Sequence, residues 1–481
     1  MNEYCLTMGN LTETYEVQLE KELGIMKNNP QSQPSRAGTL LWYQLSLIGV
    51  GSIIGAGFFL GTGVSIRIAG PALLVGYLIG GLVAYIVYHA LAEMSVHDPQ
   101  PGSFRTYARK AFGPYMGFMS GWIYWVAGVL IMSSEIVALS VFTRFWLPGV
   151  PLWIFSVIYS VLGFGIIGLG TSNFGKIESL FGLIKLCTLV VFIGFGLLIT
   201  TGLISFAHTA APVSSMNTLF PNGLLGLWSA LVYVLFSYGG IEELGVASNE
   251  LKHKKDAPKA GTVMLIMLTA IYACSLYFVF QLVNWQEINE SRSPFITALL
   301  PFHLPFLDSL FNLIIISAAF STMVGTLFTV TQVMVSLSQD GDAPQALSRM
   351  NKRNVPLQAL LMSASGLAAA ICFSFWLQNT IYAYFTTAAG LLLILNWIII
   401  LASYIRNRSS YRSIQDQRSR VSRTLTSYTG IGIIILVVMG SLLRSDERIG
   451  CYVALGIVAV IGAACTIKHT HWNGWFKQKA R

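Results

Sequence analysis

Twelve apolar stretches, each long enough to cross a lipid bilayer, constrain the fold of this chain more than any other feature. A membrane-spanning helix needs roughly 20 predominantly apolar residues. Only 11% of the 481 residues are charged, less than half the share that is usual in soluble proteins. The stretches cover residues 42–66, 71–95, 116–143, 152–169, 178–203, 223–246, 261–283, 307–337, 357–377, 380–404, 426–444 and 449–468. We therefore expect an all-α polytopic membrane protein with 12 transmembrane helices.

The positive charges lie almost entirely in alternate connecting segments. If the N-terminus is inside, 24 of the 30 Lys and Arg residues lie in cytoplasmic segments, five lie in outer segments, and Lys185 lies within a span. By the positive-inside rule, this bias predicts a multi-pass cell-membrane protein with both termini in the cytoplasm. It also explains the net charge of +9 without a nucleic-acid partner.

Glycine interrupts the first span. Six of the fifteen residues from Gly49 to Gly63 are glycine, and each one costs helix stability relative to alanine. Unwound backbone inside a bilayer is tolerated only where it is buried in protein or lines a cavity. The stretch therefore predicts either a ligand site made of free amides and carbonyls or close helix packing through small residues.

A second interruption lies five spans later, at Gly239-Gly240, and Glu242 follows within one turn. Two broken helices at this spacing indicate two five-helix repeats of opposite orientation, followed by two more helices. The predicted parts are a cytoplasmic tail at 1–40, a first repeat at 41–204, a second repeat at 223–404, a basic cytoplasmic loop at 405–425, two last spans within 426–468 and a cytoplasmic tail at 469–481. A further basic inner loop is expected around Arg105–Lys110.

An ammonium group, that of Lys185, is expected deep in the fifth span. About eight residues of predicted helix precede it, which places it roughly 12 Å into the bilayer. It either reaches the inner head groups or, as we favour, faces the bundle interior as a functional group. In the eighth span, Ser321 and Thr322 either bond their own backbone or hold a cation against carbonyls of a broken helix.

Five ordered motifs resemble those of bacterial amino acid permeases of the amino acid–polyamine–organocation superfamily. They are Gly51-Ser-Ile-Ile-Gly-Ala-Gly57 with Ala69-Gly-Pro71, Gly121-Trp-x-Tyr-Trp125, Phe174-Gly-x-Ile-Glu178 with Leu183-Ile-Lys185, Phe236-Ser-Tyr-Gly-Gly-Ile-Glu242, and Gln339-Asp-Gly-x-Ala-Pro344. The resemblance implies the inverted-repeat fold of the sodium-coupled leucine transporter, with five plus five helices, two more helices, and function by alternating access.

The resemblance also implies a substrate site built largely from main-chain groups. Amides around Ala56 and Gly57 would receive the substrate α-carboxylate at the start of a half-helix, and a side chain at position 57 would fill that place. Carbonyls on both broken helices would accept the α-ammonium. These carbonyls belong to Ile53, Phe236, Ser237 and Gly239. The substrate side chain would point toward the third, sixth, eighth and tenth spans, where the candidate wall residues are Tyr124, Tyr238 and Asn396.

The same resemblance places Lys185 where sodium-coupled relatives hold an ion, between the first, fifth and eighth helices and against Ser321 and Thr322. A lysine held in an apolar interior can exchange its proton when its surroundings change. We therefore expect a proton as the coupling ion. Glu135 and Glu242 are further candidate proton carriers, or else structural hydrogen-bond anchors.

Together these features predict a proton-coupled uptake permease for a neutral or apolar L-amino acid, surrounded by membrane lipid. The Gly239-Gly240 pair leaves room beside the site and favours a bulkier apolar side chain. The alternatives are an exchanger without net proton coupling and a nutrient sensor that binds substrate without moving it. A membrane enzyme is disfavoured because only His89, among seven histidines, lies within a span. The six cysteines lack CxxC spacing, so no metal site or disulfide framework is expected, and no cofactor besides the proton. The sequence does not predict an oligomeric state.

Overall fold

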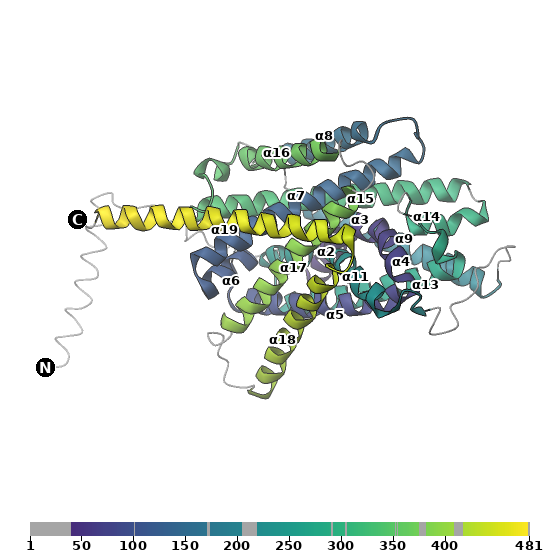
Figure 1. The fold of residues 1–481 in the computed structure, drawn as a ribbon, viewed down its shortest axis with the longest axis horizontal. Coiled ribbons are helices and arrows are strands. Elements are labelled where there is room, and N and C mark those ends of the chain that lie inside the picture. The colour runs from purple at the N-terminus through teal and green to yellow at the C-terminus, as the bar shows by residue number, and fades with distance from the viewer. Residues whose placement is uncertain are drawn as a thin grey trace. The chain divides into compact units, whose positions relative to one another are not determined.

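The structure is a computed structural model, and it describes residues 40–100, 102–170, 174–203, 219–289, 292–303, 305–351, 353, 355–374, 381–407 and 417–479. Its regular elements in these ranges are helices (Figure 1). The helices that surround the site are α2 (Trp42–Ile53), α3 (Ala56–Phe59), α7 (Pro114–Arg144), α9 (Phe174–Thr200), α11 (Gly223–Phe236), α12 (Ile241–Ala247), α15 (Pro305–Gln339) and α17 (Ile381–Asn407). The other α-helices are α4 (Gly61–Ala69), α5 (Leu73–His97), α6 (Ser103–Phe112), α8 (Leu152–Leu169), α13 (Ala257–Leu282), α14 (Pro294–Leu299), α16 (Leu357–Ser374), α18 (Gln417–Gly440) and α19 (Ser445–Lys479).

Within the described residues, each of the twelve predicted apolar stretches lies mostly on helix, but fewer than twelve helices qualify as spans on length and hydropathy. Within the described ranges, eight helical stretches are long and apolar enough to cross a membrane. Three apolar helices are shorter, at Leu152–Gly168, Leu357–Cys372 and Thr424–Gly440. The fold is therefore all-α and polytopic as predicted, whereas the exact number of twelve spans stays a prediction.

The predicted interruption of the first span is present. Helix α2 ends at Ile53, and Ile54 and Gly55 both have extended backbone before α3 begins at Ala56. Gly55 has no room for a side chain, because a Cβ there would lie 2.5 Å from a carboxylate oxygen of Glu135. The glycine therefore lets a carboxylate approach the start of α3.

The second interruption separates α11 from α12 and lies against the first. The chain turns through residues 237–240, and Gly240 has φ +107°, a conformation that residues with a side chain rarely adopt. A Cβ at Gly240 would also lie 3.0 Å from the carbonyl oxygen of Ser52, at the end of α2. Glycine is thus needed here both for the turn and for the contact between the two broken helices.

A short main-chain bridge joins the other ends of α2 and α12. The segment before α2 pairs with the segment after α12 in an isolated parallel β-bridge between Leu40 and Leu251. The Leu40 amide donates to the Glu250 carbonyl at 3.0 Å, and the Lys252 amide donates to the Leu40 carbonyl at 2.9 Å. These two half-helices are therefore linked both at the break and at their far ends.

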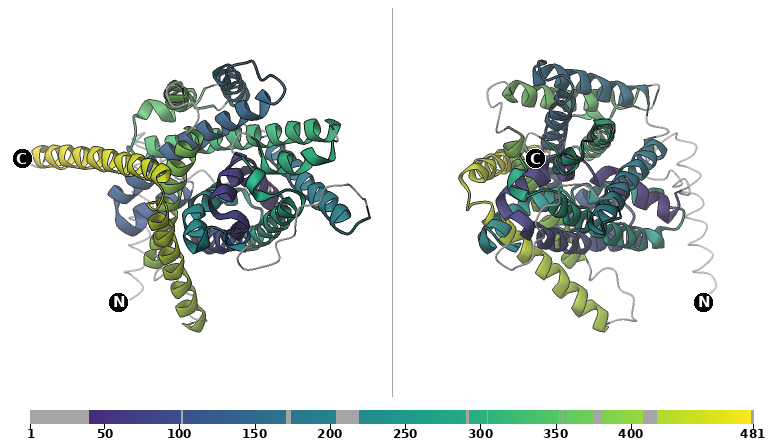
Figure 2. Two further views of the ribbon diagram at one scale, coloured as in Figure 1. Left: turned by 45° about the vertical axis from the view of Figure 1, so that its right-hand side comes forward. Right: turned by 90° about the vertical axis from the view of Figure 1, so that its right-hand side faces the viewer.

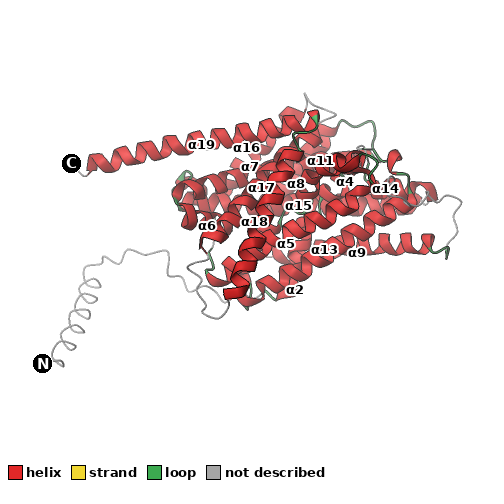
Figure 3. Cartoon of the chain, turned by 60° about the horizontal axis from the view of Figure 1, so that its bottom comes forward, coloured by secondary structure: helices red, strands yellow, loops and turns green. Residues whose placement is uncertain are grey.

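The remaining long helices enclose the two broken ones. Helices α7 and α15 run side by side across the molecule, and α8 and α16 lie together at one edge (Figure 1). Helices α5, α13 and α9 follow one another on another side (Figure 3). Helices α18 and α19 extend away from the body (Figure 2). The core is apolar, and its largest fully buried side chain is Trp397 of α17.

Three segments differ in extent from the sequence-based prediction. The basic stretch Arg105–Lys110, expected as a loop, lies in helix α6. Its buried residues Phe104, Tyr107, Ala108 and Ala111 have the i, i+3, i+4, i+7 spacing of an amphipathic helix. Helix α9 begins at Phe174 rather than at 178, and α19 continues to Lys479 through most of the predicted tail. Residues 1–39 and 408–416 of the predicted tail and basic loop lie outside the described residues.

A buried ionic cluster fixes α6 against α15 and α19. Arg105 is 1% exposed, and its Nη1 lies 3.2 Å from Oδ2 of Asp342. Arg105 also pairs with Asp340, and Lys468 of α19 lies 2.6 Å from the second oxygen of Asp342. Arg109 of α6 also lies 3.6 Å from Asp342, so Asp342 pairs with three cations from two helices.

Asp342→Asn is expected to lower the free energy of unfolding by about 3–5 kcal/mol, because it leaves the buried Arg105 without full compensation. Thermal unfolding of the detergent-purified protein measures the change. The matched control is Asp98→Asn, whose partner Lys110 is exposed and whose loss should cost less than about 1 kcal/mol. Equal losses in the two variants would contradict this role of Asp342.

Candidate functional site

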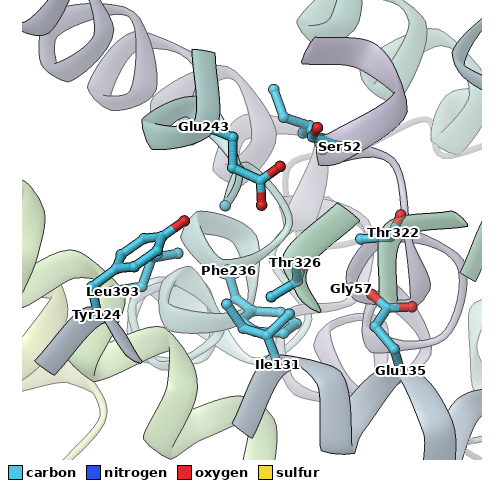
Figure 4. Close-up of a pocket in the computed structure, with 13 residues that line it drawn as sticks. Ser52, Gly57, Tyr124, Ile131, Glu135, Phe236, Glu243, Thr322, Thr326 and Leu393 are labelled. Carbon is cyan, nitrogen blue, oxygen red and sulfur yellow. The ribbon is translucent and has the colours of Figure 1, made fainter. Parts of the chain in front are cut away.

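A small cavity lies where the two interrupted helices meet (Figure 4). Its lining comes from α2, α3, α7, α11, α12, α15 and α17 and from the turn at 237–240. Its volume is about 20 Å³, which is room for about one water molecule. Sites that enclose a small-molecule ligand are usually about 300–1,000 Å³. An occupant larger than water therefore requires these helices to move apart.

The structure brings six of the predicted site residues together around this cavity. They are Ile53, Gly57, Glu135, Phe236, Gly239 and Thr322. The Phe236 ring packs against Gly57, where an added Cβ would lie 3.0 Å from two ring carbons. Tyr124, a predicted wall residue, also lines the cavity. The predicted residues Ala56, Lys185, Ser237, Tyr238, Glu242, Ser321 and Asn396 lie outside its lining.

The main-chain amide at the start of α3 is bound by a carboxylate of the protein itself. The Ala56 N–H donates to both oxygens of Glu135, each at 3.0 Å. Glu135 comes from the middle of α7 and is 2% exposed. The position predicted to receive a substrate carboxylate therefore holds the carboxylate of Glu135.

Lys185 reaches the same broken helix from α9. Eleven residues of helix precede it, which corresponds to roughly 16 Å along the axis, and its side chain is fully buried. Its Nζ donates to the Gly51 carbonyl of α2 and to the Thr322 hydroxyl of α15, the latter at 2.9 Å. Gly182 permits this approach, because a Cβ there would lie 2.4 Å from the Leu47 carbonyl.

The hydroxyls of the predicted pair Ser321 and Thr322 have different hydrogen-bond partners. The Thr322 hydroxyl, which accepts from Lys185, lies 3.0 Å from the Ile54 carbonyl at the break. The Ser321 hydroxyl instead donates to Glu178 of α9, at 3.1 and 3.2 Å from its two oxygens. A carboxylate and an ammonium from α9 thus meet adjacent hydroxyls of α15.

Ser237 and Tyr238 stabilise the second break rather than line the cavity. The Ser237 hydroxyl lies 2.9 Å from the Gly57 carbonyl and accepts from the Tyr77 hydroxyl at 3.2 Å. The Tyr238 hydroxyl donates to the Tyr77 carbonyl at 2.9 Å. Asn396 is likewise engaged elsewhere, since its Oδ1 accepts from the Ser120 hydroxyl at 2.7 Å.

Two successive glutamates of α12 have different surroundings. One Glu242 oxygen lies 3.1 Å from the amide nitrogen of Gly240, and the other accepts from the Trp397 indole. These contacts match the structural-anchor alternative. Glu243, which the sequence reasoning missed, lines the cavity and forms hydrogen bonds with the hydroxyls of Ser52 and Thr329. The sequence signal that could have indicated Glu243 is its position as a second acidic residue next to Glu242 in an apolar stretch.

Aromatic side chains pack around α3, the short helix that follows the break in the first span. Phe58 of α3 stacks on Tyr272 of α13, with ring centroids 3.7 Å apart, and meets Tyr77 and Phe295 edge-on or tilted. The Tyr382 hydroxyl of α17 donates to the Ala56 carbonyl at 3.0 Å. The start of α3 is therefore held by rings from several helices.

Comparison with known proteins identifies the family of this chain. The chain matches the amino acid permease family over residues 44–479. It is 38% identical over 443 residues to the uncharacterized transporter YcgH of Bacillus subtilis (strain 168), covering 92% of this chain and 97% of that protein. It is 30% identical over 380 residues to the aromatic amino acid transport protein AroP of Escherichia coli (strain K12), covering 78% of this chain and 81% of that protein.

Two solved structures share the fold. One is MhsT in complex with L-phenylalanine, with a TM-score of 0.59 and 16% identity over 84% of this chain and 99% of that chain. The other is the Eremococcus coleocola manganese transporter, with a TM-score of 0.57 and 12% identity over 91% of this chain and 97% of that chain. The protein is a multi-pass membrane protein, and the chain belongs to the amino acid permease family.

Proposed function

We propose that this protein is a secondary active transporter that takes up a neutral L-amino acid together with protons. Its cycle is alternating access in a fold of two inverted five-helix repeats and two further helices, with both termini cytoplasmic. The observation that carries the proposal is the contact of two buried titratable groups, Glu135 and Lys185, with the interrupted first span.

Substrate binding uses the backbone at both breaks. The α-carboxylate takes the amides of Ala56 and Gly57, and the α-ammonium takes carbonyls of Ile53 and of the turn after Phe236. The apolar walls supplied by Ile131, Phe236 and Leu393 support an apolar side-chain body. The similarity to the aromatic amino acid transport protein AroP supports a bulky side chain. The aromatic cluster around Phe58 acts as the outer gate.

Glu135 couples substrate binding to protons. The substrate carboxylate and the Glu135 carboxylate compete for the same Ala56 amide. A carboxylate that leaves this amide within the protein interior needs a proton or a cation as a new partner. Binding of substrate therefore favours uptake of a proton by Glu135.

Lys185 couples the proton to the movement of α2. Its ammonium ties the Gly51 carbonyl to Thr322, and so ties α2 to α15. A neutral amine donates more weakly to the carbonyl than an ammonium does. Release of the proton from Lys185 therefore weakens the hydrogen bonds between α2 and α15 and allows α2 to move. The buried carboxylates Glu135, Glu178 and Glu243 all interact electrostatically with this ammonium.

Uptake into proteoliposomes tests the proposal. With the outside acidic, labelled amino acid is expected to accumulate, and a protonophore is expected to abolish the accumulation. Accumulation that is unchanged without the pH gradient would exclude symport, and counterflow of equal rate in both conditions would identify an exchanger. Binding without any flux would identify a sensor.

Glu135→Gln is expected to tighten substrate binding about fivefold, because a neutral amide competes less strongly for the Ala56 N–H than a charged carboxylate does. It is also expected to abolish pH-driven accumulation, because the amide of glutamine cannot take up and release a proton as the carboxylate does. Titration with substrate, followed by thermal stabilisation, measures the affinity, and Glu287→Gln, at an exposed residue, is the control. Weaker binding with intact accumulation would refute the competition.

A further inference from the structure

A second cavity, here called the lateral cavity, lies between α5, α17 and α18 and shares no lining residue with the central one. Its volume is about 240 Å³, close to the lower end of the range of about 300–1,000 Å³ that is usual for small-molecule sites. It opens at the surface, because Thr426 is exposed and the side chain of His89 is 33% exposed. Five of its seven lining residues carry a hydroxyl or an imidazole, namely Tyr85, His89, Tyr404, Thr426 and Ser427.

The lateral cavity forms where α18 leaves the rest of the bundle. At Gly430 an added Cβ would lie 3.0 Å from Ile86 of α5 and 3.1 Å from Leu401 of α17, so the three helices meet closely there. Ile86 also lines the lateral cavity. Toward its first residue, α18 extends away from the body (Figure 1). The lateral cavity is therefore the space that opens beside this close contact.

Its level along the helices is the boundary between apolar and polar sequence. His89 lies eight residues before the end of α5, or roughly 12 Å along the axis, and Tyr404 lies three residues before the end of α17. Thr426 and Ser427 lie near the start of the apolar part of α18, which is Thr424–Gly440. In a bilayer this boundary is the level at which the hydrocarbon core meets the lipid head groups.

The surface around the lateral cavity is suited to acyl chains. Leu82 is 54% exposed and lies on the same face of α5 as Tyr85 and His89, at i, i+3, i+7 spacing. On α18, Leu425 and Tyr428 flank the lining residues and are 63% and 57% exposed. Large exposed side chains on membrane-spanning helices contact lipid rather than water. A lipid that lies along this surface can place its head group in the lateral cavity.

The polar groups of the lateral cavity are held in place from behind. The Tyr404 hydroxyl donates to Oε2 of Glu93 at 2.6 Å, and Nδ1 of His89 lies 3.9 Å from the same oxygen. The centroid of the Tyr85 ring lies 5.8 Å from that of the His89 ring. Glu93 itself is not part of the lining. The hydroxyls and the imidazole that do form the lining can all donate hydrogen bonds, which suits the oxygens of a phosphate group.

Positively charged residues lie next to the lateral cavity in both α17 and α18. Arg418, Arg420 and Arg423 lie within the first seven residues of α18, and no acidic residue lies among them. Arg406 lies in the last turn of α17. Basic clusters beside the end of a membrane-spanning helix attract lipids whose head groups carry a net negative charge. The charge therefore favours an anionic phospholipid over a zwitterionic one.

We infer that the lateral cavity binds the head-group phosphate of an anionic phospholipid such as phosphatidylglycerol. Tyr85, His89 and Thr426 donate to the phosphate oxygens, and the acyl chains lie along α5 and α18. In the orientation proposed above, this lipid belongs to the cytoplasmic leaflet. Its head group joins α18 to α5 and α17 on the side where these helices diverge. The inference does not depend on which amino acid the protein carries.

Native mass spectrometry of the full-length, detergent-purified protein tests the inference. Phosphatidylglycerol and phosphatidylcholine with identical acyl chains compete at equal concentration, and about tenfold preferential retention of phosphatidylglycerol is expected from one or two contributing positive charges. Phosphatidylglycerol should also raise the midpoint of thermal unfolding, because it binds the folded state. Equal retention of the two lipids would overturn the inference. So would an equal rise of the midpoint with inorganic phosphate alone, which would identify a site for a soluble anion.

Matched variants assign the preference to the lateral cavity. The double variant Tyr85→Phe/Thr426→Val removes two donors with little change of shape, and it should lower the preference to below about threefold. The control, Tyr428→Phe/Thr429→Val, makes the same changes at exposed residues of α18 outside the lining and should keep the full preference. If the first variant does not fold, His89→Gln, at a partly exposed residue, takes its place. A preference that survives in the lateral-cavity variants would show that the basic residues alone attract the lipid, and would overturn the inference.

Discussion

Lys185→Ala is expected to abolish proton-driven accumulation of substrate while part of the exchange across the membrane is retained. The alanine removes the ammonium that joins the Gly51 carbonyl to Thr322, so α2 and α15 lose the contact to which we assign proton coupling. The backbone at Ala56 and Gly57, which we propose binds the substrate, is untouched. Steady-state accumulation should fall at least about tenfold, which corresponds to about 1.4 kcal/mol of lost coupling.

Proteoliposomes that contain the variant measure this effect, with uptake followed under an imposed pH gradient and exchange followed with internal substrate. Lys255→Ala, at an exposed lysine before α13, is the matched control and should accumulate substrate normally. Full driven uptake by Lys185→Ala would refute the coupling role. Because Glu178 and Glu135 lose a nearby cation in this variant, Lys185→Gln provides a second test in which a polar group remains.

Gly57→Val is expected to abolish substrate binding, with at least a hundredfold loss of affinity, or about 2.7 kcal/mol. The physical reason differs from the one that the sequence alone gives. A Cβ at this position does not point into the amide site but at Phe236, 3.0 Å from two ring carbons, and it lies 3.5 Å from Cα of Ser237. The ring must therefore move, and it lines the cavity.

A graded series separates this effect from general damage. Gly57→Ala adds only the Cβ and should weaken binding less than valine does, because the ring has to yield by only a few tenths of an ångström. Gly165→Val places the same side chain in another helix at a position where a Cβ meets nothing within 4 Å, and it should bind substrate normally. Normal binding by Gly57→Val would exclude a role for this contact.

Features that depend on local sequence were predicted well. Glycine clusters weaken a helix wherever they lie, so both interruptions, at Gly55 and at Gly240, could be predicted without knowledge of their partners. The depth of Lys185 follows from counting residues along a helix, although the earlier start of α9 adds about 4 Å to it. The family was indicated by five ordered motifs rather than by any one of them, and the comparison with known proteins confirms it.

Features that depend on how helices are rotated against one another were not predicted. Glu242 and Glu243 are adjacent, and successive side chains on a helix point about 100° apart. Only the turn at Gly240 and its contact with Ser52 determine which of them faces the cavity. The partner of Glu135 is an amide 79 residues away in the sequence, and no local pattern indicates such a contact.

The helical character of α6 was predictable in part. The spacing of Phe104, Tyr107, Ala108 and Ala111 gives one buried face, but the basic residues around them suggested an exposed loop. Arg105 is buried because two aspartates more than 200 residues away receive it. A charge is therefore weak evidence of exposure when its partner is distant in the sequence.

The bridge between Leu40 and Leu251 couples the movements of the two half-helices α2 and α12. Each ends at an interruption, at Ile54-Gly55 and at residues 237–240, and the bridge joins their opposite ends to each other. Two half-helices that are interrupted side by side and joined at their other ends are expected to move together. Opening at the end that carries the Leu40–Leu251 bridge is then a single cooperative step, in which displacement of either half-helix also displaces the other.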